Sequence, residues 1–133
     1  NMQTPETQKS ILLIDDDKFL IEMYSLKFKN SGFDVYFALG PEEALKQLRG
    51  GLNPSVILMD LVMPAMDGLE LLSVIRKEEL AKQSVIIMLT NQGVPDDISR
   101  AKKLNVNGYI IKASSIPSEV LTEVIRIYES SKK

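Results

Sequence analysis

The sequence of 133 residues predicts one α/β domain, in which a five-stranded parallel sheet is doubly wound with helices on both faces. Five short apolar runs alternate along the chain with five amphipathic stretches, which is the order of five strand–helix units. Three of the runs are apolar throughout, and this indicates strands that are covered on both faces, as in a parallel sheet. The crossovers between these strands are then expected to be right-handed.

The elements are expected in strict alternation. The predicted strands cover residues 10–14 (SILLI), 33–38 (FDVYFA), 55–59 (SVILM), 84–89 (SVIIML) and 107–111 (NGYII). The predicted helices cover residues 17–30, 41–50, 67–80, 95–104 and 117–131. Pro41 and Pro95 suit the first turn of a helix, and each is followed by two acidic residues at the positive end of the helix dipole. Gly50 with Gly51, and Asn105, suit helix ends because these residue types take the left-handed conformation easily.

The composition limits the chemistry that the chain can carry. The net charge is −2, so no large positive field is available for a phosphate backbone, and nucleic acid is not expected as a direct partner. Cysteine and histidine do not occur, which excludes disulfides, thiolate or histidine metal sites and Ser-His-Asp catalysis. No run is apolar enough to span a membrane and no signal-peptide pattern begins the chain, so we expect a cytoplasmic protein.

Several polar side chains are expected at one edge of the sheet, because ligands bind beyond the carboxyl ends of the strands in such folds. Asp15 and Asp16 follow the first strand, Asp60 the third, Thr90 the fourth and Lys112 the fifth, whereas the second strand is expected to lie away from the site. Clustered carboxylates repel unless a cation lies among them, and a few oxygen ligands suit Mg²⁺ that keeps several waters. Lys112 is expected to pair with Asp60 when nothing else is bound.

Four segments, ILLIDDD, ILMDLVMPAMDG, VIIMLTN and GYIIK, resemble the receiver domains of two-component response regulators of the single-domain, chemotaxis type. The resemblance covers about residues 10–129 and implies a flavodoxin-like fold. It implies that Asp60 accepts a phosphoryl group in a Mg²⁺-dependent reaction, with Mn²⁺ as a possible substitute, and loses it slowly without acting as an enzyme on other substrates. Asp15 and Asp16 would form the acidic pair, with Asp16, Asp60 and the backbone carbonyl of Val62 as the direct metal ligands.

The resemblance also assigns roles around the acceptor. Thr90 would hydrogen-bond the phosphoryl group, Lys112 would pair with it, and Tyr109 matches the aromatic switch position. Metal, lysine and hydroxyl are the groups that stabilise charge on phosphoryl oxygens. Phosphorylation would change the surface made by the helices near 95–104 and 117–131. The implied partners are a sensor histidine kinase or a histidine phosphotransfer protein as donor, and an unknown downstream effector protein.

Three positions depart from the pattern of that family. Ala113 follows Lys112 where the family usually has a proline in a cis bond, and because a cis bond before alanine costs roughly 2.5–4 kcal/mol, we expect a trans bond and a different loop. Asn91 is bulkier than the small residue usual after the threonine, which narrows access to the site. The pair Asn105–Val106 replaces the usual Gly-Ala, a change that a helix end tolerates.

The first helix carries a hypothesis about docking. At 100° per residue, Phe19, Leu20, Met23 and Leu26 fall on one side and are expected to face the sheet. Ile21 falls off this stripe, close to the acidic residues, and is expected to be exposed. We therefore consider Ile21 either an incidental exposed apolar residue or a contact for the histidine-bearing donor.

The sequence has features of two other classes of function. Asp15 and Asp17 form an Asp-x-Asp arrangement like that of haloacid-dehalogenase-type phosphatases, with Asp15 as nucleophile. That reading leaves Asp60 unexplained and lacks a later acidic motif, and Asp17 is instead expected to cap the first helix. A flavodoxin-like cofactor binder would need a phosphate loop after the first strand, where three aspartates repel phosphate.

The domain limits are simple. Residues 1–9 are expected to be an N-terminal tail and residues 10–131 a receiver domain. Asn1 precedes Met2 and is set aside as a residue left from expression. The short ends favour a standalone protein, although a receiver cut from a longer regulator, or a phosphotransfer intermediate, has the same features.

Overall fold

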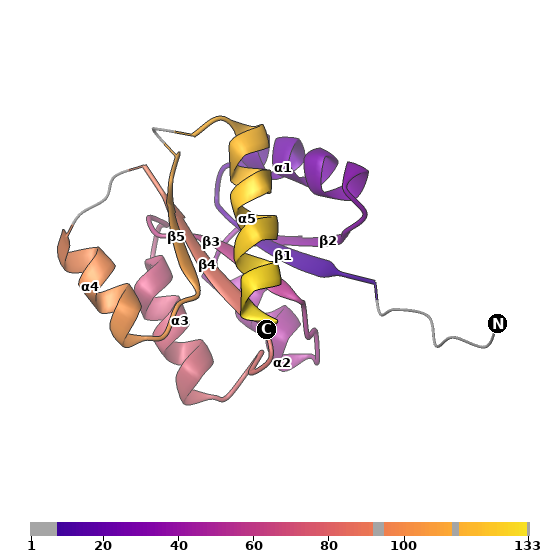
Figure 1. Ribbon diagram of the computed structural model, residues 1–133. Coiled ribbons are helices and arrows are strands. Elements are labelled where there is room, and N and C mark those ends of the chain that lie inside the picture. The colour runs from indigo at the N-terminus through magenta and orange to yellow at the C-terminus, as the bar shows by residue number, and fades with distance from the viewer. Residues whose placement is uncertain (1–7, 92–94, 113–114, 133) are drawn as a thin grey trace.

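A single parallel sheet of five strands forms the centre of the molecule (Figure 1). The computed structural model describes residues 8–91, 95–112 and 115–132. The strand order is β2-β1-β3-β4-β5, and every neighbouring pair is parallel. The predicted doubly wound α/β fold is therefore confirmed. The strands are β1 (Ser10–Ile14), β2 (Asp34–Ala38), β3 (Val56–Asp60), β4 (Val85–Thr90) and β5 (Gly108–Ile111).

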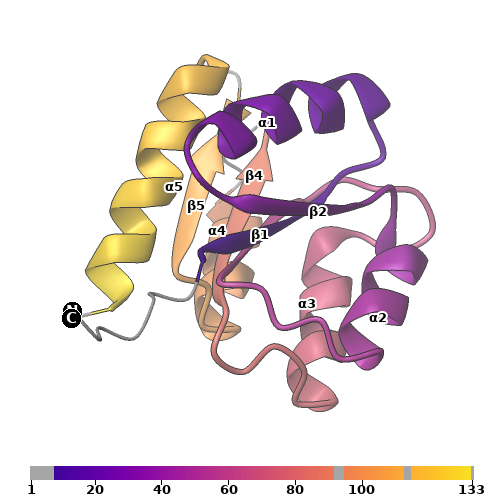
Figure 2. The same cartoon turned by 90° about the vertical axis from the view of Figure 1, so that its right-hand side faces the viewer.

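Helices cover both faces of this sheet. Residues of α1 and α5 pack on one face and residues of α2, α3 and α4 on the other, so two separate apolar cores flank the strands (Figure 2). None of the helices in the described ranges is long and apolar enough to cross a membrane. The helices are α1 (Lys18–Asn30), α2 (Pro41–Arg49), α3 (Gly68–Lys77), α4 (Pro95–Lys103) and α5 (Pro117–Ser131).

The three strands predicted to be covered on both faces occupy the middle of the sheet. Every residue of β3 and β4 is buried, as are four of the five residues of β1. In contrast, β2 is an edge strand that exposes Tyr36 and Phe37. The side-chain amide of Gln47 in α2 donates a hydrogen bond to the Phe37 carbonyl at this edge (2.8 Å). The second strand, expected to lie away from the site, is next to β1 and contributes no residue to the pocket that contains the clustered aspartates.

The predicted helix signals are confirmed at most positions. Asp17 caps α1, because its Oδ1 accepts hydrogen bonds from the backbone N–H groups of Phe19 (2.9 Å) and Leu20 (3.3 Å). The two prolines begin α2 and α4. Asn105 has a left-handed backbone (φ 61°) just after α4, and after α2 it is Gly51 (φ 107°), rather than Gly50, that takes the positive φ.

The predicted inner face of α1 is wrong. Ile21, expected to be exposed, is 4% exposed and packs in the core together with Tyr24 and Phe28. Phe19 and Leu26, expected to face the sheet, are 85% and 61% exposed. The reason is that apolar residues lie on both sides of this helix, so two different stripes fit the helical period. The stripe of Ile21, Tyr24 and Phe28, at spacings of three and four residues, packs inward.

Candidate functional site

A pocket of about 620 Å³ opens at the carboxyl end of the sheet, between the ends of β1, β3 and β5 and the start of α1. It is lined by the three aspartates that follow β1, by Asp60 and by Lys112. A groove of similar size between α1 and β2 is more apolar and contains one carboxylate, that of Glu22, so the clustered charges lie in the first pocket. The predicted site residues Asp15, Asp16, Asp60 and Lys112 are thus brought together.

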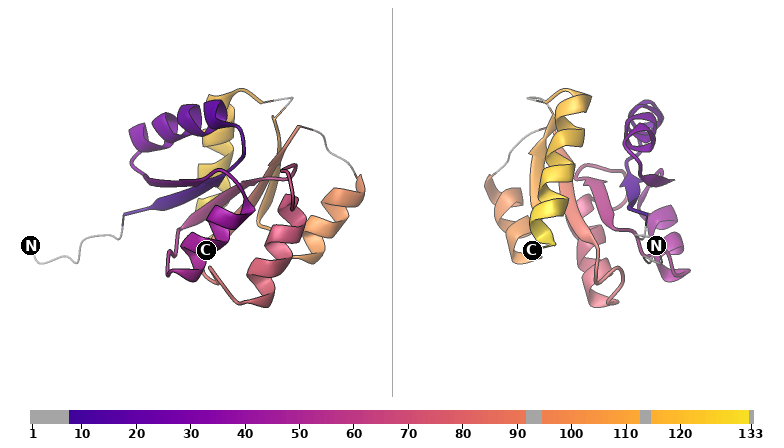
Figure 3. Two further views of the ribbon diagram at one scale, coloured as in Figure 1. Left: turned by 180° about the vertical axis from the view of Figure 1, so that it is seen from behind. Right: turned by 45° about the vertical axis from the view of Figure 1, so that its right-hand side comes forward.

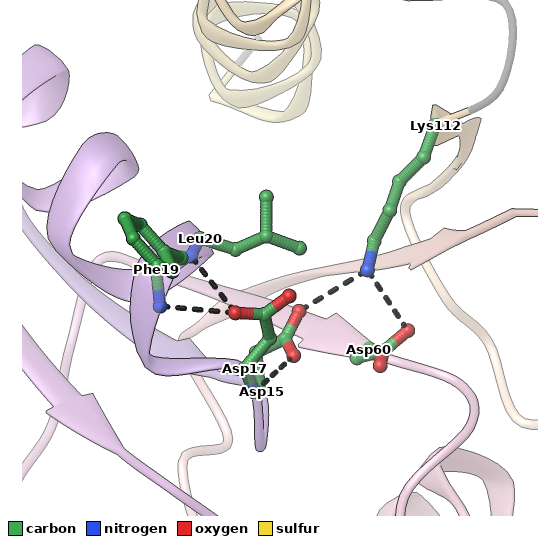
Figure 4. Close-up of polar contacts among 6 residues, drawn as sticks. All are labelled: Asp15, Asp17, Phe19, Leu20, Asp60 and Lys112. Atoms are coloured by element: carbon green, nitrogen blue, oxygen red, sulfur yellow. Dashed lines mark hydrogen bonds and ion pairs between the residues drawn. The ribbon is translucent and has the colours of Figure 1, made fainter.

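Lys112 connects two carboxylates at the floor of this pocket (Figure 4). Its Nζ lies 3.2 Å from Asp15 Oδ2 and 3.5 Å from Asp60 Oδ1, and all three side chains are largely buried. Asp15 Oδ1 also accepts a hydrogen bond from the backbone N–H of Asp17 (2.9 Å). The lysine therefore supplies one positive charge to two buried negative charges, which leaves the cluster short of positive charge.

The surroundings of Asp60 disfavour its charged form. Burial, and next the negative charge of Asp15, raise the pKa of the Asp60 carboxyl to about 6. Lys112 and the backbone N–H of Val62 act in the opposite direction but do not compensate. A cation bound among the carboxylates would lower this pKa again, because opposite charge favours the ionised form.

Three carboxylates are arranged so that they could hold a metal ion. One oxygen each from Asp15, Asp16 and Asp60 lies within 4.8 Å of the others. Asp16 is exposed, whereas the other two are buried, so the site is open on one side to water. An oxygen-only ligand set with room for retained waters fits a hard divalent cation. Val62 lines the same pocket, with an exposed side chain.

The loop after β3 is held tightly against the end of that strand, at Asp60. A Cβ atom at Gly68 would lie 2.5 Å from the backbone oxygen of Asp60, so only glycine fits at this position. Asp67 caps α3, since its side chain accepts from the backbone N–H of Glu70 (2.8 Å), whose own side chain accepts from the backbone N–H of Asp67 (3.2 Å). The Asp-Gly pair in the sequence thus fixes the start of α3 beside Asp60.

Thr90 and Tyr109 are placed differently from the charged residues. Thr90 is the buried last residue of β4, and its neighbour Asn91 lines the pocket. Tyr109 lies on β5, and its buried hydroxyl has no hydrogen-bond partner within the described ranges. Burial, and then the charge of Asp97 in α4, raise the pKa of Tyr109. The departure predicted at Ala113 lies outside the described residues.

The pocket also contains side chains that the sequence analysis did not assign to it. Leu20, Met23 and Tyr24 of α1 line its wall, and Ser115 and Pro117 line it from the start of α5. Tyr24 was not predicted at the pocket because the wrong face of α1 was expected to pack inward. The spacing of Ile21, Tyr24 and Phe28, three and four residues apart, is the sequence signal for the buried face.

Comparison with known proteins identifies the family. A family model described as the response regulator receiver domain matches residues 11–126. The chain belongs to this family. Receiver domains of this type are phosphoacceptors rather than classical enzymes, and the acidic cluster around Asp60 is consistent with a phosphoacceptor site. The phosphatase alternative finds no support in this match.

The chain is similar to relatives of which it covers about half and to relatives that it covers almost completely. It is 32% identical over 123 residues to the alkaline phosphatase synthesis transcriptional regulatory protein PhoP of Bacillus subtilis, covering 92% of this chain and 50% of that protein. It is 30% identical over 118 residues to the chemotaxis protein CheY1 of Helicobacter pylori, covering 88% and 94%. The chain spans about half the length of PhoP and of the mycobacterial DNA-binding response regulators MtrA that it also matches. The solved structure of Vibrio cholerae CheY4 superposes with a TM-score of 0.82 at 26% identity, covering 91% of this chain and 99% of that one.

Proposed function

We propose that Asp60 accepts a phosphoryl group from a phosphohistidine donor. A carboxylate oxygen of Asp60 attacks phosphorus, the bond from phosphorus to the imidazole nitrogen breaks, and its electron pair stays on the imidazole. The observation that carries this proposal is the single lysine shared by two buried carboxylates, of which Asp60 has a raised pKa. A Mg²⁺ ion held by Asp15, Asp16, Asp60 and the Val62 carbonyl, or Mn²⁺ in its place, would supply positive charge to the phosphoryl oxygens.

Two further residues are proposed to act on the phosphoryl group. Lys112 turns from the carboxylates to a phosphoryl oxygen, which is supported by its position between Asp15 and Asp60. Thr90 donates a hydrogen bond to a second oxygen, which is supported by its place at the end of the strand next to β3. Both contacts are stronger in a pocket that excludes bulk water.

The proposed output is a change in the surface of α4, β5 and α5. The hydroxyl of Tyr109 is buried without a partner within the described ranges, and an unsatisfied buried hydroxyl costs about 1–3 kcal/mol. This cost reduces the free-energy difference between the present position of the ring and a second position in which the hydroxyl would have a partner. Movement of Thr90 toward the phosphoryl group would favour an inward position of the Tyr109 ring. The phosphoryl group can shift the populations of the two ring positions only by its differential affinity for them.

We propose that the donor docks on exposed apolar residues of α1 rather than on Ile21. Ile21 is buried, but Phe19, Met23 and Leu26 are exposed on α1. Met23 lines the pocket, and Phe19 follows two residues after Asp17, which also lines it. A protein that delivers a phosphoryl group to Asp60 has to cover this rim. We propose that the protein is cytoplasmic, that a sensor histidine kinase or a histidine phosphotransfer protein is its donor, and that a downstream effector binds α4, β5 and α5.

The acceptor is tested by labelling with acetyl phosphate, followed by borohydride reduction and peptide mass mapping. We expect the label on the peptide that contains Asp60, none in Asp60→Asn, and none when the metal is chelated. Asp34→Asn, at an exposed position on β2, is the matched control and should label normally. A label on the peptide of Asp15, or undiminished labelling of Asp60→Asn, would contradict the proposal.

The docking surface is tested with Phe19→Glu. This variant should lose phosphotransfer from its kinase, because a charge replaces an apolar contact, yet react normally with acetyl phosphate. An equal loss with both donors would indicate damage to the pocket instead.

A further inference from the structure

Tyr24 is the polar member of the inner stripe of α1. It is 5% exposed and lies between the apolar side chains of Ile21 and Phe28. Helical side chains lean toward the helix N-terminus, which in α1 is the end beside the pocket. The phenol of Tyr24 therefore reaches up to the pocket, which it lines together with Asp15, Asp60 and Lys112.

The hydroxyl of Tyr24 is available for a hydrogen bond in the pocket. A buried tyrosine hydroxyl usually has a partner, yet none is found for Tyr24 within residues 8–91, 95–112 and 115–132. The fully enclosed hydroxyls without partners in those ranges belong to Ser25 and Tyr109. The small area that Tyr24 retains thus opens on the pocket that it lines. Burial, and then the charges of Asp15 and Asp60, raise the pKa of Tyr24, so the phenol stays protonated and can donate.

Asp15 has a need that this donor can meet. It accepts hydrogen bonds from the Asp17 N–H (2.9 Å) and from Lys112 Nζ (3.2 Å), and Lys112 is shared with Asp60. A phosphoryl group on Asp60 would draw Lys112 away, which would leave Asp15 buried with one donor. A neutral phenol can replace the lost hydrogen bond without adding a charge that competes with a metal ion.

We propose that Tyr24 is a positioning residue for metal binding, whose phenol O–H donates to Asp15, directly or through a water in the pocket. This contact keeps the carboxylate of Asp15 oriented toward the metal, both while Lys112 is shared with Asp60 and after Lys112 turns to the phosphoryl group. The inference rests on the proposed function of Asp60. It concerns the inner stripe of α1, whose other buried residues, Ile21 and Phe28, pack in the apolar core.

The test is Tyr24→Phe, which removes the hydroxyl and keeps the ring, with the exposed Tyr36→Phe as matched control. Mg²⁺ binding is measured by calorimetry on the unphosphorylated protein. The typical net contribution of one hydrogen bond predicts a Kd for Mg²⁺ about three- to tenfold higher in Tyr24→Phe and unchanged in Tyr36→Phe. Acetyl-phosphate labelling of Tyr24→Phe should need about three- to tenfold more Mg²⁺ for half-maximal rate and reach the wild-type rate at saturation.

A spectroscopic measurement separates this role from a structural one. The chain has four tyrosines and no tryptophan, so Mg²⁺ binding should perturb tyrosine absorbance in the wild type and in Tyr36→Phe, but not in Tyr24→Phe. An equal Kd in Tyr24→Phe and the wild type would overturn the inference. A labelling rate that stays low at saturating Mg²⁺ would also overturn it, as a packing defect. A wild type that does not bind Mg²⁺ would overturn the proposed function itself.

Discussion

The helices α3 and α4 lie side by side on one face of the sheet, yet they are held in different ways (Figure 3). In α3, five of ten residues are buried, whereas in α4, of nine residues, only Ala101 is buried. Helix α3 follows β3, the strand that ends in Asp60, and helix α4 precedes β5, the strand that contains Tyr109. The comparison teaches that the proposed phosphoryl site adjoins the firmly packed helix of this face, while the proposed output surface includes the loosely packed one.

Polar contacts hold the C-terminal end of α4. The guanidinium of Arg76 in α3 donates hydrogen bonds to the carbonyls of Leu104 and Asn105 (3.1 Å each). Partial burial lowers the pKa of Arg76, but the group stays charged at any physiological pH. A cation at the end of a helix also interacts favourably with the helix dipole. Within the described residues, the N-terminal half of α4, with Asp97, receives no such hydrogen bond from α3.

The largest expected difference between the two helices is in their contribution to stability. Leu72→Ala in α3 removes a fully buried side chain and should lower the free energy of unfolding by about 2–5 kcal/mol. Ile98→Ala in α4, where the side chain is partly buried, should cost less than about 1.5 kcal/mol. Urea denaturation followed by circular dichroism measures both. Equal losses would refute the comparison.

The second largest effect is expected at Asp60, whose buried carboxylate destabilises the folded protein when it is charged. The pKa of Asp60 is raised from 3.8 to about 6 in the folded state, so the folded protein binds more protons than the unfolded one between these values. The contribution of Asp60 to stability is thus highest below about pH 4, falls as the pH rises to about 6, and stays low above it. Asp60→Asn lacks this loss and should be about 1–3 kcal/mol more stable than the wild type at pH 7.5 without metal.

The pH dependence of that difference is its control. Urea denaturation in the presence of a chelator should show the gap between Asp60→Asn and the wild type shrinking from pH 7.5 to pH 4.5. Saturating Mg²⁺ should also close it at pH 7.5, because bound metal stabilises the charged wild-type site. A gap that does not change with pH would mean that the asparagine acts through packing.

The smallest expected effect concerns the polar contacts of α4. Arg76→Gln removes the charge and one of the two hydrogen bonds and should lower global stability by only about 0.5–1.5 kcal/mol. Amide hydrogen exchange in α4 should nevertheless become several-fold faster than in α3, because local opening of α4 no longer breaks these contacts. Exchange that rises equally in both helices would show that they open as one unit.

The sequence was sufficient for the features that a local pattern specifies. The apolar runs became the strands β1 to β5 within a residue or so, and the caps at Asp17 and Asn105 follow from their own side chains. The rotation of α1 was not predictable in this way. Both Ile21 and Phe19 belong to apolar stripes of the right period, and the choice between them depends on the path of the chain from β1 into the helix.

The candidate site was predictable as a cluster but not in its connections. The topology of a parallel sheet brings Asp15, Asp60 and Lys112 to one edge whatever their side chains do. That Lys112 lies closer to Asp15 than to Asp60, and that Tyr24 completes the wall, depends on packing between α1 and the sheet. Those details are tertiary, and no spacing in the sequence encodes them.

The hydrogen bond from Gln47 to the Phe37 carbonyl has a consequence for self-association. An exposed strand edge with aromatic side chains is a template on which another chain can add a strand, the first step of edge-to-edge aggregation. The amide of Gln47 occupies one of the acceptors that an incoming strand would use, so α2 acts as a cover for the edge of the sheet. Self-association at high concentration is therefore expected to depend on α2, a short helix that contributes no residue to the pocket of Asp60.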